Sequence, residues 1–192
     1  MATATLTPPV APTGLMTGDD FLAQYGDRTG YELVKGHLKE IPMPGAIHGH
    51  VCFKASIVIG NYILEHKLGW AFMNDTFIRT RTNPDGVRGA DMAFVSYSTR
   101  AADNPPPAGA LIPPLELVVE VRSPSDSIND MTAKATEYLD AGVKVVVILD
   151  PQTDSAGVFR PDELPQRFHN GDELKLDDIL PGFAVPVARF FA

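Results

Sequence analysis

The stretch from residue 115 to residue 150 constrains the fold more than any other part of the chain. Leu115–Val121 reads LELVVEV and Val143–Leu149 reads VKVVVIL, and both runs predict strands. The segment Ile128–Ala141 between them predicts an amphipathic helix. Strand, helix and strand make a βαβ unit with parallel strands, and an almost wholly apolar second strand indicates burial on both faces. The sequence therefore predicts an α/β fold with a central sheet flanked by helices.

The N-terminal part predicts smaller elements. Residues 1–16 are rich in Thr, Pro and Ala and predict a flexible tail, with one domain over residues 17–192. Thr17 has the side chain of a helix N-cap, which predicts a helix through Tyr25. Tyr31–Lys35 and His37–Ile41 predict an N-terminal β-hairpin.

The middle of the chain predicts one helix and three strands. Residues 48–67 have apolar side chains almost all round, which predicts a largely buried helix. Short strands are expected at 70–73 and 77–82, and a returning strand at 90–95.

Composition excludes several classes of protein. The chain has 16 Lys and Arg against 24 Asp and Glu, a net charge of −8, which argues against broad electrostatic capture of nucleic acid or anionic membrane but allows a local basic patch. No apolar run approaches the roughly 20 residues that cross a bilayer, so no membrane is expected. One cysteine, Cys52, cannot form an intrachain disulfide, and together with the absence of a signal sequence this predicts a cytoplasmic protein.

The strand at 115–121 carries a carboxylate that needs an explanation. Glu120 lies between Val119 and Val121, where an unpaired ionised group would be costly. Arg122 follows two positions later on the same face. Glu120 and Arg122 are either a plain ion pair at a strand end or part of a site that holds a metal and a phosphate.

Two further residues extend this pattern. Asp91 precedes an apolar strand, either as a turn residue or as a carboxylate offered to a site. With Glu120 it would make an oxygen-rich site suited to Mg²⁺ or Mn²⁺. Lys134 projects from the flank of the buried stripe of the 128–141 helix, so its ammonium group either returns to these carboxylates or extends into solvent.

A transition-metal site at His48-Gly49-His50 is disfavoured. Side chains two residues apart on a helix point in directions about 200° apart, and no third ligand follows at a suitable spacing. Cys52 lies in an apolar helix and is expected to pack as a small hydrophobic side chain.

Taken in order, these residues resemble a large bacterial family of restriction-type endonucleases within the PD-(D/E)xK superfamily. The resemblance covers about residues 18–191, and each segment is short. The matching segments are Tyr31–Gly36, His48-Gly49, Asp91 with Phe94-Val95, Leu117–Val121 with Ser123-Pro124-Ser125, Lys134, Tyr138, Ala141-Gly142-Val143, Asp150-Pro151 and Leu180–Phe183.

The resemblance implies a restriction-endonuclease-like mixed sheet and Mg²⁺-dependent cleavage of DNA phosphodiester bonds. It implies that Asp91 and Glu120 hold the metal, that Glu32 completes its shell, and that the superfamily lysine has moved to the following helix as Lys134. Two departures are Ala90, where proline is usual, and Arg122, which occupies the usual lysine position. We expect Lys134 to polarise the attacking water and Arg122 to contact phosphate, since an arginine is a poor general base.

Other side chains complete the predicted site. The hairpin before Asp91 carries a candidate phosphate track, and His48 is a candidate for the cleft. A homodimer is expected, since cutting both strands takes two sites. The alternative is an inactive nuclease-fold module that binds nucleic acid or a protein partner. The phosphate-contact residues are Arg79, Arg81 and Arg88.

Overall fold

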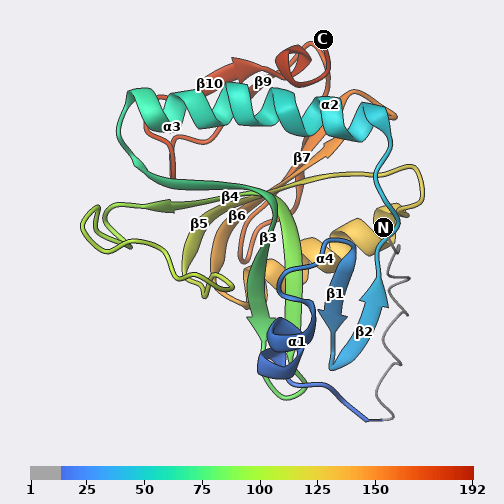
Figure 1. Ribbon diagram of the computed structural model, residues 1–192. Helices are drawn as coiled ribbons and strands as arrows, with labels where there is room; N and C mark the ends of the chain where they lie inside the picture. The colour runs from blue at the N-terminus through green and yellow to red at the C-terminus, as the bar shows by residue number, and fades with distance from the viewer. Residues whose placement is uncertain (1–13) are drawn as a thin grey trace, which may run out of the picture.

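A computed structural model describes residues 14–192, and its centre is the predicted βαβ unit. Strands β5 (Leu115–Val121) and β6 (Val143–Asp150) are parallel, with Val118 opposite Val146, and α4 (Ile128–Asp140) crosses between them (Figure 1). Every residue of β5 is buried, and so is every residue of β6 except Lys144. The α/β prediction from this stretch is confirmed.

The sheet has eight strands and is mixed. Along one path the order is β2-β1-β4-β5-β6-β7-β8, and β3 pairs with β4 on its other side. Every pair other than β5–β6 is antiparallel. The other strands are β1 (Tyr31–Val34), β2 (His37–Glu40), β3 (Gly69–Arg81), β4 (Gly86–Ser96), β7 (Ser155–Phe159) and β8 (Gln166–Phe168).

Strand β4 has one edge that is shared by two partners. Near its start Val87 pairs with Leu33 of β1, and farther on Met92 pairs with Val119 of β5. Between these points, over residues 88–91, this edge of β4 has no strand partner among the described residues. The sheet therefore opens at this place, where β1 and β5 diverge.

Helices cover both faces of the sheet. On one face lies a continuous helical segment, formed by α2 (Ala46–Ala55), a π-helical turn (Ser56–Gly60) and α3 (Asn61–Glu65), together with the C-terminal part of the chain (Figure 1). On the other face α4 packs through Met131, Ala135 and Tyr138. The C-terminal part holds a two-stranded sheet, β9 (Glu173–Lys175) and β10 (Ala184–Pro186), and a 3₁₀ turn (Val187–Phe190).

The predicted helix at 48–67 forms, but the expectation that it is largely buried is wrong. It starts two residues earlier, at Ala46. Val51, Ala55, Ile59 and Ile63 enter the core, whereas Phe53 is 58% exposed and Leu64 is 69% exposed. Hydropathy alone does not distinguish a helix lying on a sheet from one enclosed by it. Within residues 14–192 no helix is long and apolar enough to cross a membrane.

The two short strands predicted at 70–73 and 77–82 are one strand, β3, with a bulge between Met73 and Thr76. Asn74 and Asp75 have positive φ there, at 66° and 54°, because the extra residues bend the strand. Strand β4 begins at Gly86, earlier than the predicted Ala90. Asp91 consequently lies in the middle of a strand, beside the opening.

The predicted first helix and first hairpin are confirmed. Helix α1 (Gly18–Tyr25) is capped by Thr17, whose side chain accepts a hydrogen bond from the Asp20 N–H. Residues 1–13, most of the predicted tail, lie outside the described residues. Met16, the last residue of that range, is buried with Phe21 and Tyr25 beneath the β1–β2 hairpin.

Candidate active site at the opening of the sheet

A cleft of about 1100 Å³ lies over the opening between β1 and β5. It is lined from β1, the start of α2, the bulge of β3, β4, β5 and α4. Most of the residues that the sequence predicted for the site meet here, together with Asp75, which it did not predict. The ionisable side chains at its centre are Glu32, His48, Asp75, Arg88, Asp91, Glu120 and Lys134.

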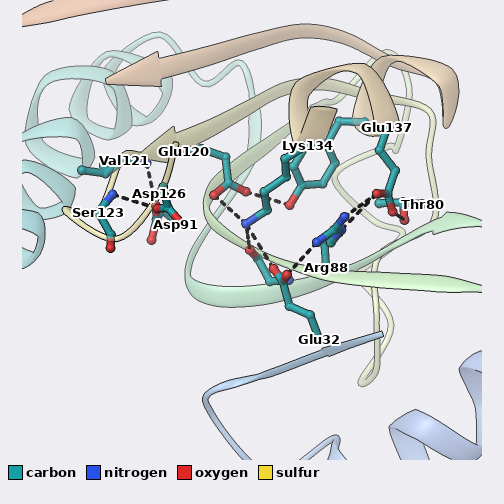
Figure 2. A network of polar contacts seen from close by, with 12 residues as sticks. Glu32, Thr80, Arg88, Asp91, Glu120, Val121, Ser123, Asp126, Lys134 and Glu137 are labelled. Atoms are coloured by element: carbon teal, nitrogen blue, oxygen red, sulfur yellow. Dashed lines mark hydrogen bonds and ion pairs between the residues drawn. The ribbon is translucent and has the colours of Figure 1, made fainter. Parts of the chain in front are cut away.

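Lys134 extends from α4 to the carboxylates, and not into solvent. Its Nζ lies 2.8 Å from Glu120 Oε2 and 3.1 Å from Glu32 Oε1, and it donates to the Gly89 carbonyl at 3.2 Å (Figure 2). Tyr138, one turn farther along α4, donates its hydroxyl hydrogen to the other oxygen of Glu120 at 2.7 Å. Both oxygens of the Glu120 carboxylate therefore have a donor from α4.

Glu32 is held by a second cation. Arg88 donates to Glu32 Oε2 at 2.9 Å, and on its other side Nε and Nη2 both donate to Oε2 of Glu137 (Figure 2). The Gly89 N–H also donates to Glu32, at 3.2 Å. Glu32 thus accepts a hydrogen bond from the backbone at the unpaired edge of β4, and its two oxygens also contact Lys134 and Arg88.

Asp91 lies across the opening from Glu120. Asp91 directly precedes Met92, where the pairing of β4 with β5 ends, and both Asp91 and Glu120 line the cleft. The charge of Asp91 is close enough to raise the pKa of Glu120. Asp91 accepts a hydrogen bond from the Val121 N–H at 2.7 Å, and His48 Nε2 lies 3.4 Å from the same oxygen.

The surroundings of Arg122 and Lys134 show which of these two cations lies beside Glu120. Arg122 donates to the Asp150 carboxylate and to the Asp126 carbonyl, both at 3.0 Å. It does not line the cleft. Lys134 is the cation beside Glu120, because the side chain of Arg122 is directed toward the end of β6.

The three predicted phosphate-contact arginines do not form one track. Arg79 pairs with Asp19 of α1, Arg81 is exposed, and Arg88 is buried between two carboxylates. Neither Arg79 nor Arg81 lines the cleft. Two other cations line it and are exposed, Arg28 after α1 and Lys39 on β2.

The charges around the opening are not balanced. Burial raises the pKa of Glu120 to about 7; Lys134 opposes this shift, and the charges of Asp91 and Glu32 add to it. Burial and the charge of Asp91 likewise raise the pKa of Asp75. Burial also opposes ionisation of Asp91, but the hydrogen bond and charge of His48 and the Val121 N–H outweigh it and lower the pKa of Asp91. The cluster has more carboxylates than its cations can neutralise.

This donor set fits a divalent cation. Mg²⁺ binds through one or two carboxylates and keeps waters or phosphate oxygens in its other positions. Asp91 and Glu120 provide two carboxylates on facing strands, and an added positive charge would favour the ionised form of each. The residues present are therefore suited to Mg²⁺ or Mn²⁺.

The sequence analysis missed Cys52 as a neighbour of the site. Its Sγ lies 3.5 Å from His48 Nδ1, and His48, Cys52 and Asp91 place ligand atoms within 4.8 Å of one another. The signal was present, because His48 and Cys52 are four residues apart and so lie on one helix face. Their common neighbour Asp91 is distant in sequence.

A mixed α/β fold with a carboxylate pair and a lysine at a break in the sheet is the arrangement of restriction-endonuclease-like nucleases, the class that the sequence resembles. The family model Uma2, described as "Putative restriction endonuclease", matches residues 19–188, and the chain belongs to this family. This confirms the resemblance found in the sequence.

A solved structure shares the fold. The crystal structure of a "putative nuclease belonging to DUF820" from Anabaena variabilis ATCC 29413 aligns with a TM-score of 0.78 and 20% identity. The alignment covers 92% of this chain and 97% of that one. A search of curated proteins returned no significant match.

The raised pKa of Glu120 gives a pH-dependent stability. A carboxyl group whose pKa is about 7 in the folded protein and 4.5 unfolded stabilises the fold below pH 4.5, and this contribution is lost as the pH rises to 7. In EDTA, we expect the free energy of unfolding of the wild type to fall relative to Glu120→Gln by up to about 3 kcal/mol between pH 4.5 and 7.5, measured by urea unfolding.

Glu116 is the matched control. It is also buried on β5, but hydrogen bonds from Thr99, Ser96 and Lys144 outweigh its burial and lower its pKa. Glu116→Gln is therefore expected to keep the wild-type decline over this pH range. Equal declines in wild type and Glu120→Gln would contradict the assignment.

Proposed function

We propose that this chain is a divalent-metal-dependent endonuclease that hydrolyses DNA phosphodiester bonds. One observation carries the proposal: Asp91 and Glu120 line the same cleft at the opening of the sheet, and Lys134 contacts Glu120 from α4. The family description and the nuclease fold support the reaction class.

Asp91 and Glu120 would hold Mg²⁺, or Mn²⁺ in its place. Such an ion, when bound, lowers the pKa of a coordinated water and offsets negative charge on the phosphoryl oxygens. We do not assign Glu32 to the metal shell, because its two oxygens contact three donors, Lys134, the Gly89 N–H and Arg88. Each oxygen of Glu120 accepts from one donor and keeps a lone pair for a metal. Its proposed task is to hold Lys134 in place.

The chain's own residues position the reaction. The charges of Glu120 and Glu32 outweigh burial and raise the pKa of Lys134, so it stays an ammonium group. A permanent cation at this place orients an attacking water and stabilises charge that develops on the phosphate, but it does not remove a proton. Tyr138 fixes the Glu120 carboxylate, and Glu137 fixes Arg88.

A second candidate is an inactive module on the same fold that binds nucleic acid or a protein. The net charge of −8 and the acidic cleft favour its protein-binding form, because the phosphates of a nucleic acid are repelled from such a cleft unless a cation is bound. This candidate requires that partner binding persist when Asp91 and Glu120 are both replaced.

Cleavage is the direct test of the nuclease proposal. We expect Mg²⁺-dependent nicking of plasmid DNA by the wild type and a loss of roughly 10²-fold or more in rate for Asp91→Asn, Glu120→Gln and Lys134→Ala. Isothermal titration with Mn²⁺ is expected to lose binding in the two carboxylate variants. Asp140→Asn, an exposed change at the end of α4, is the control and should cleave as the wild type does.

A folded wild type that neither binds Mn²⁺ nor cleaves single-stranded, duplex or supercoiled DNA would overturn the nuclease proposal. The binding-module candidate would then be tested with the same variants.

Arg28 and Lys39 are proposed as phosphate contacts in place of the predicted arginine track. In a Glu120→Gln background, changing both to Ala should weaken duplex binding and lower the slope of log affinity against log salt by about 0.9 for each phosphate that is no longer neutralised. Arg81→Ala removes an exposed cation that does not line the cleft and is the control. Fluorescence anisotropy over a salt series measures the duplex affinity and its salt slope. If Arg81→Ala lowered the affinity and the slope as much as the Arg28 and Lys39 changes do, the assignment would be contradicted.

We further propose a homodimer in the cytoplasm, where the DNA substrate lies. One active site cuts one strand, so a double-strand break takes two copies or two encounters. Sedimentation velocity is expected to give twice the chain mass of 20.8 kDa when DNA is present. A monomer at all concentrations, with and without DNA, would contradict the dimer and leave the nuclease proposal intact.

A further inference from the structure

A mixed cluster of donor atoms lies beside the carboxylate site, between α2 and β4. His48 and Cys52 are one helical turn apart and face Asp91 of β4. His48 Nε2 lies 3.4 Å from Asp91 Oδ2, and His48 Nδ1 lies 3.5 Å from Cys52 Sγ. The side chains of His48 and Asp91 are only 11% and 12% exposed. Within residues 14–192 no other three His, Cys, Asp or Glu side chains place ligand atoms this close.

The spacing is close to that in the coordination shell of a small transition-metal ion. Ligand atoms roughly 2.0–2.3 Å from a tetrahedral zinc ion lie roughly 3.3–3.8 Å from one another. The separations of 3.4 and 3.5 Å involve the two different nitrogens of the His48 ring, of which a metal ion binds one. With one ligand atom from each residue, the three atoms lie within 4.8 Å of one another, so side-chain rotation brings them around a common centre by closing gaps of up to about 1 Å. Nitrogen and sulfur donors favour Zn²⁺ or Co²⁺ over Mg²⁺.

A nucleophilic Cys–His–Asp triad is the other arrangement with these residue types, and the surroundings disfavour it. Burial raises the pKa of the Cys52 thiol strongly, and the charges of Asp91, Asp75 and Glu120 add to this shift. A nucleophilic cysteine needs the opposite environment, one that favours the thiolate. A bound dication would offset the same negative charges.

We propose that His48, Cys52 and Asp91 bind a thiophilic transition-metal ion such as Zn²⁺, with the fourth position open to the cleft. Asp91 belongs to both this site and the proposed Mg²⁺ site. Binding of Zn²⁺ therefore withdraws Asp91 from Mg²⁺ and inhibits cleavage. The inhibition rests on the proposed nuclease function, whereas the binding does not.

Co²⁺ is the probe for binding, because Co²⁺–thiolate bonds give a near-ultraviolet charge-transfer band. Cys52 is the only cysteine of the chain, so in tag-free protein such a band reports this residue alone. We expect the band in the wild type and its loss in Cys52→Ser, with Zn²⁺ affinity lowered by at least the roughly 10–100-fold that loss of an outer-shell partner costs. His48→Asn and Asp91→Asn should weaken the band.

His50→Asn is the matched control, since His50 is exposed and lies two residues from His48 on the same helix. It should leave the band unchanged. Alkylation of Cys52 by iodoacetamide gives a second readout, which we expect Zn²⁺ to slow in wild type and His50→Asn but not in His48→Asn.

The binding proposal is overturned if folded wild type gives no charge-transfer band and Zn²⁺ leaves Cys52 alkylation unchanged. Fast alkylation in EDTA, at neutral pH, would instead indicate a reactive triad and also contradict it. For inhibition, each variant is compared with itself with and without Zn²⁺ at fixed Mg²⁺, and Zn²⁺ should slow the wild type but not Cys52→Ser. A Co²⁺ band without any DNA cleavage would refute the nuclease function alone.

Discussion

The unpaired edge of β4 governs the rest of the site. Between its pairings with β1 and β5, the backbone of Gly89 must find partners that are not strands, because buried polar groups without hydrogen bonds are costly. Glu32 accepts from the Gly89 N–H, and Lys134 donates to the Gly89 carbonyl. Each of these charged groups then needs a counter-charge. Arg88, Glu120 and Glu137 supply it, and so a gap in hydrogen bonding becomes a chain of ion pairs from β1 to α4 (Figure 2).

The excess of carboxylates follows from that arrangement. On the β1 side, Arg88 and Lys134 form ion pairs with the three glutamates of the cluster, Glu32, Glu120 and Glu137. On the other side, the positive charges that act on Asp91 and Asp75 are those of His48 and the more distant Lys134. A divalent cation relieves this imbalance without movement of the backbone. The same excess explains why two kinds of metal ion compete in our proposals. Asp91 lines the cleft together with Glu120 and also lies beside the His48–Cys52 pair.

The cation beside Glu120 comes from the helix and not from the strand. Helix α4 packs through Tyr138 and Ala135, and Lys134 at the edge of that contact extends over the start of the opening. Arg122 stands two residues after Glu120, where the superfamily has its lysine. Its guanidinium group donates hydrogen bonds to Asp150 at the end of β6 and to Asp126 in the loop before α4. Arg122 thus fixes the connection that sets where α4 begins, and Lys134 reaches the carboxylate as a result.

The sequence by itself determined the parallel β5–α4–β6 unit, the capped first helix and the first hairpin, because periodicity and caps act over a few residues. The family resemblance named Asp91, Glu120 and Lys134 as candidates for the site. Tertiary structure decided the rest. Whether Lys134 or Arg122 meets Glu120, that Arg88 is buried with Glu32, and that Cys52 lies near Asp91 all depend on strand register and on how α2 crosses the sheet. These contacts join residues 14 to 56 positions apart, and local patterns carry no information on which distant side chains meet.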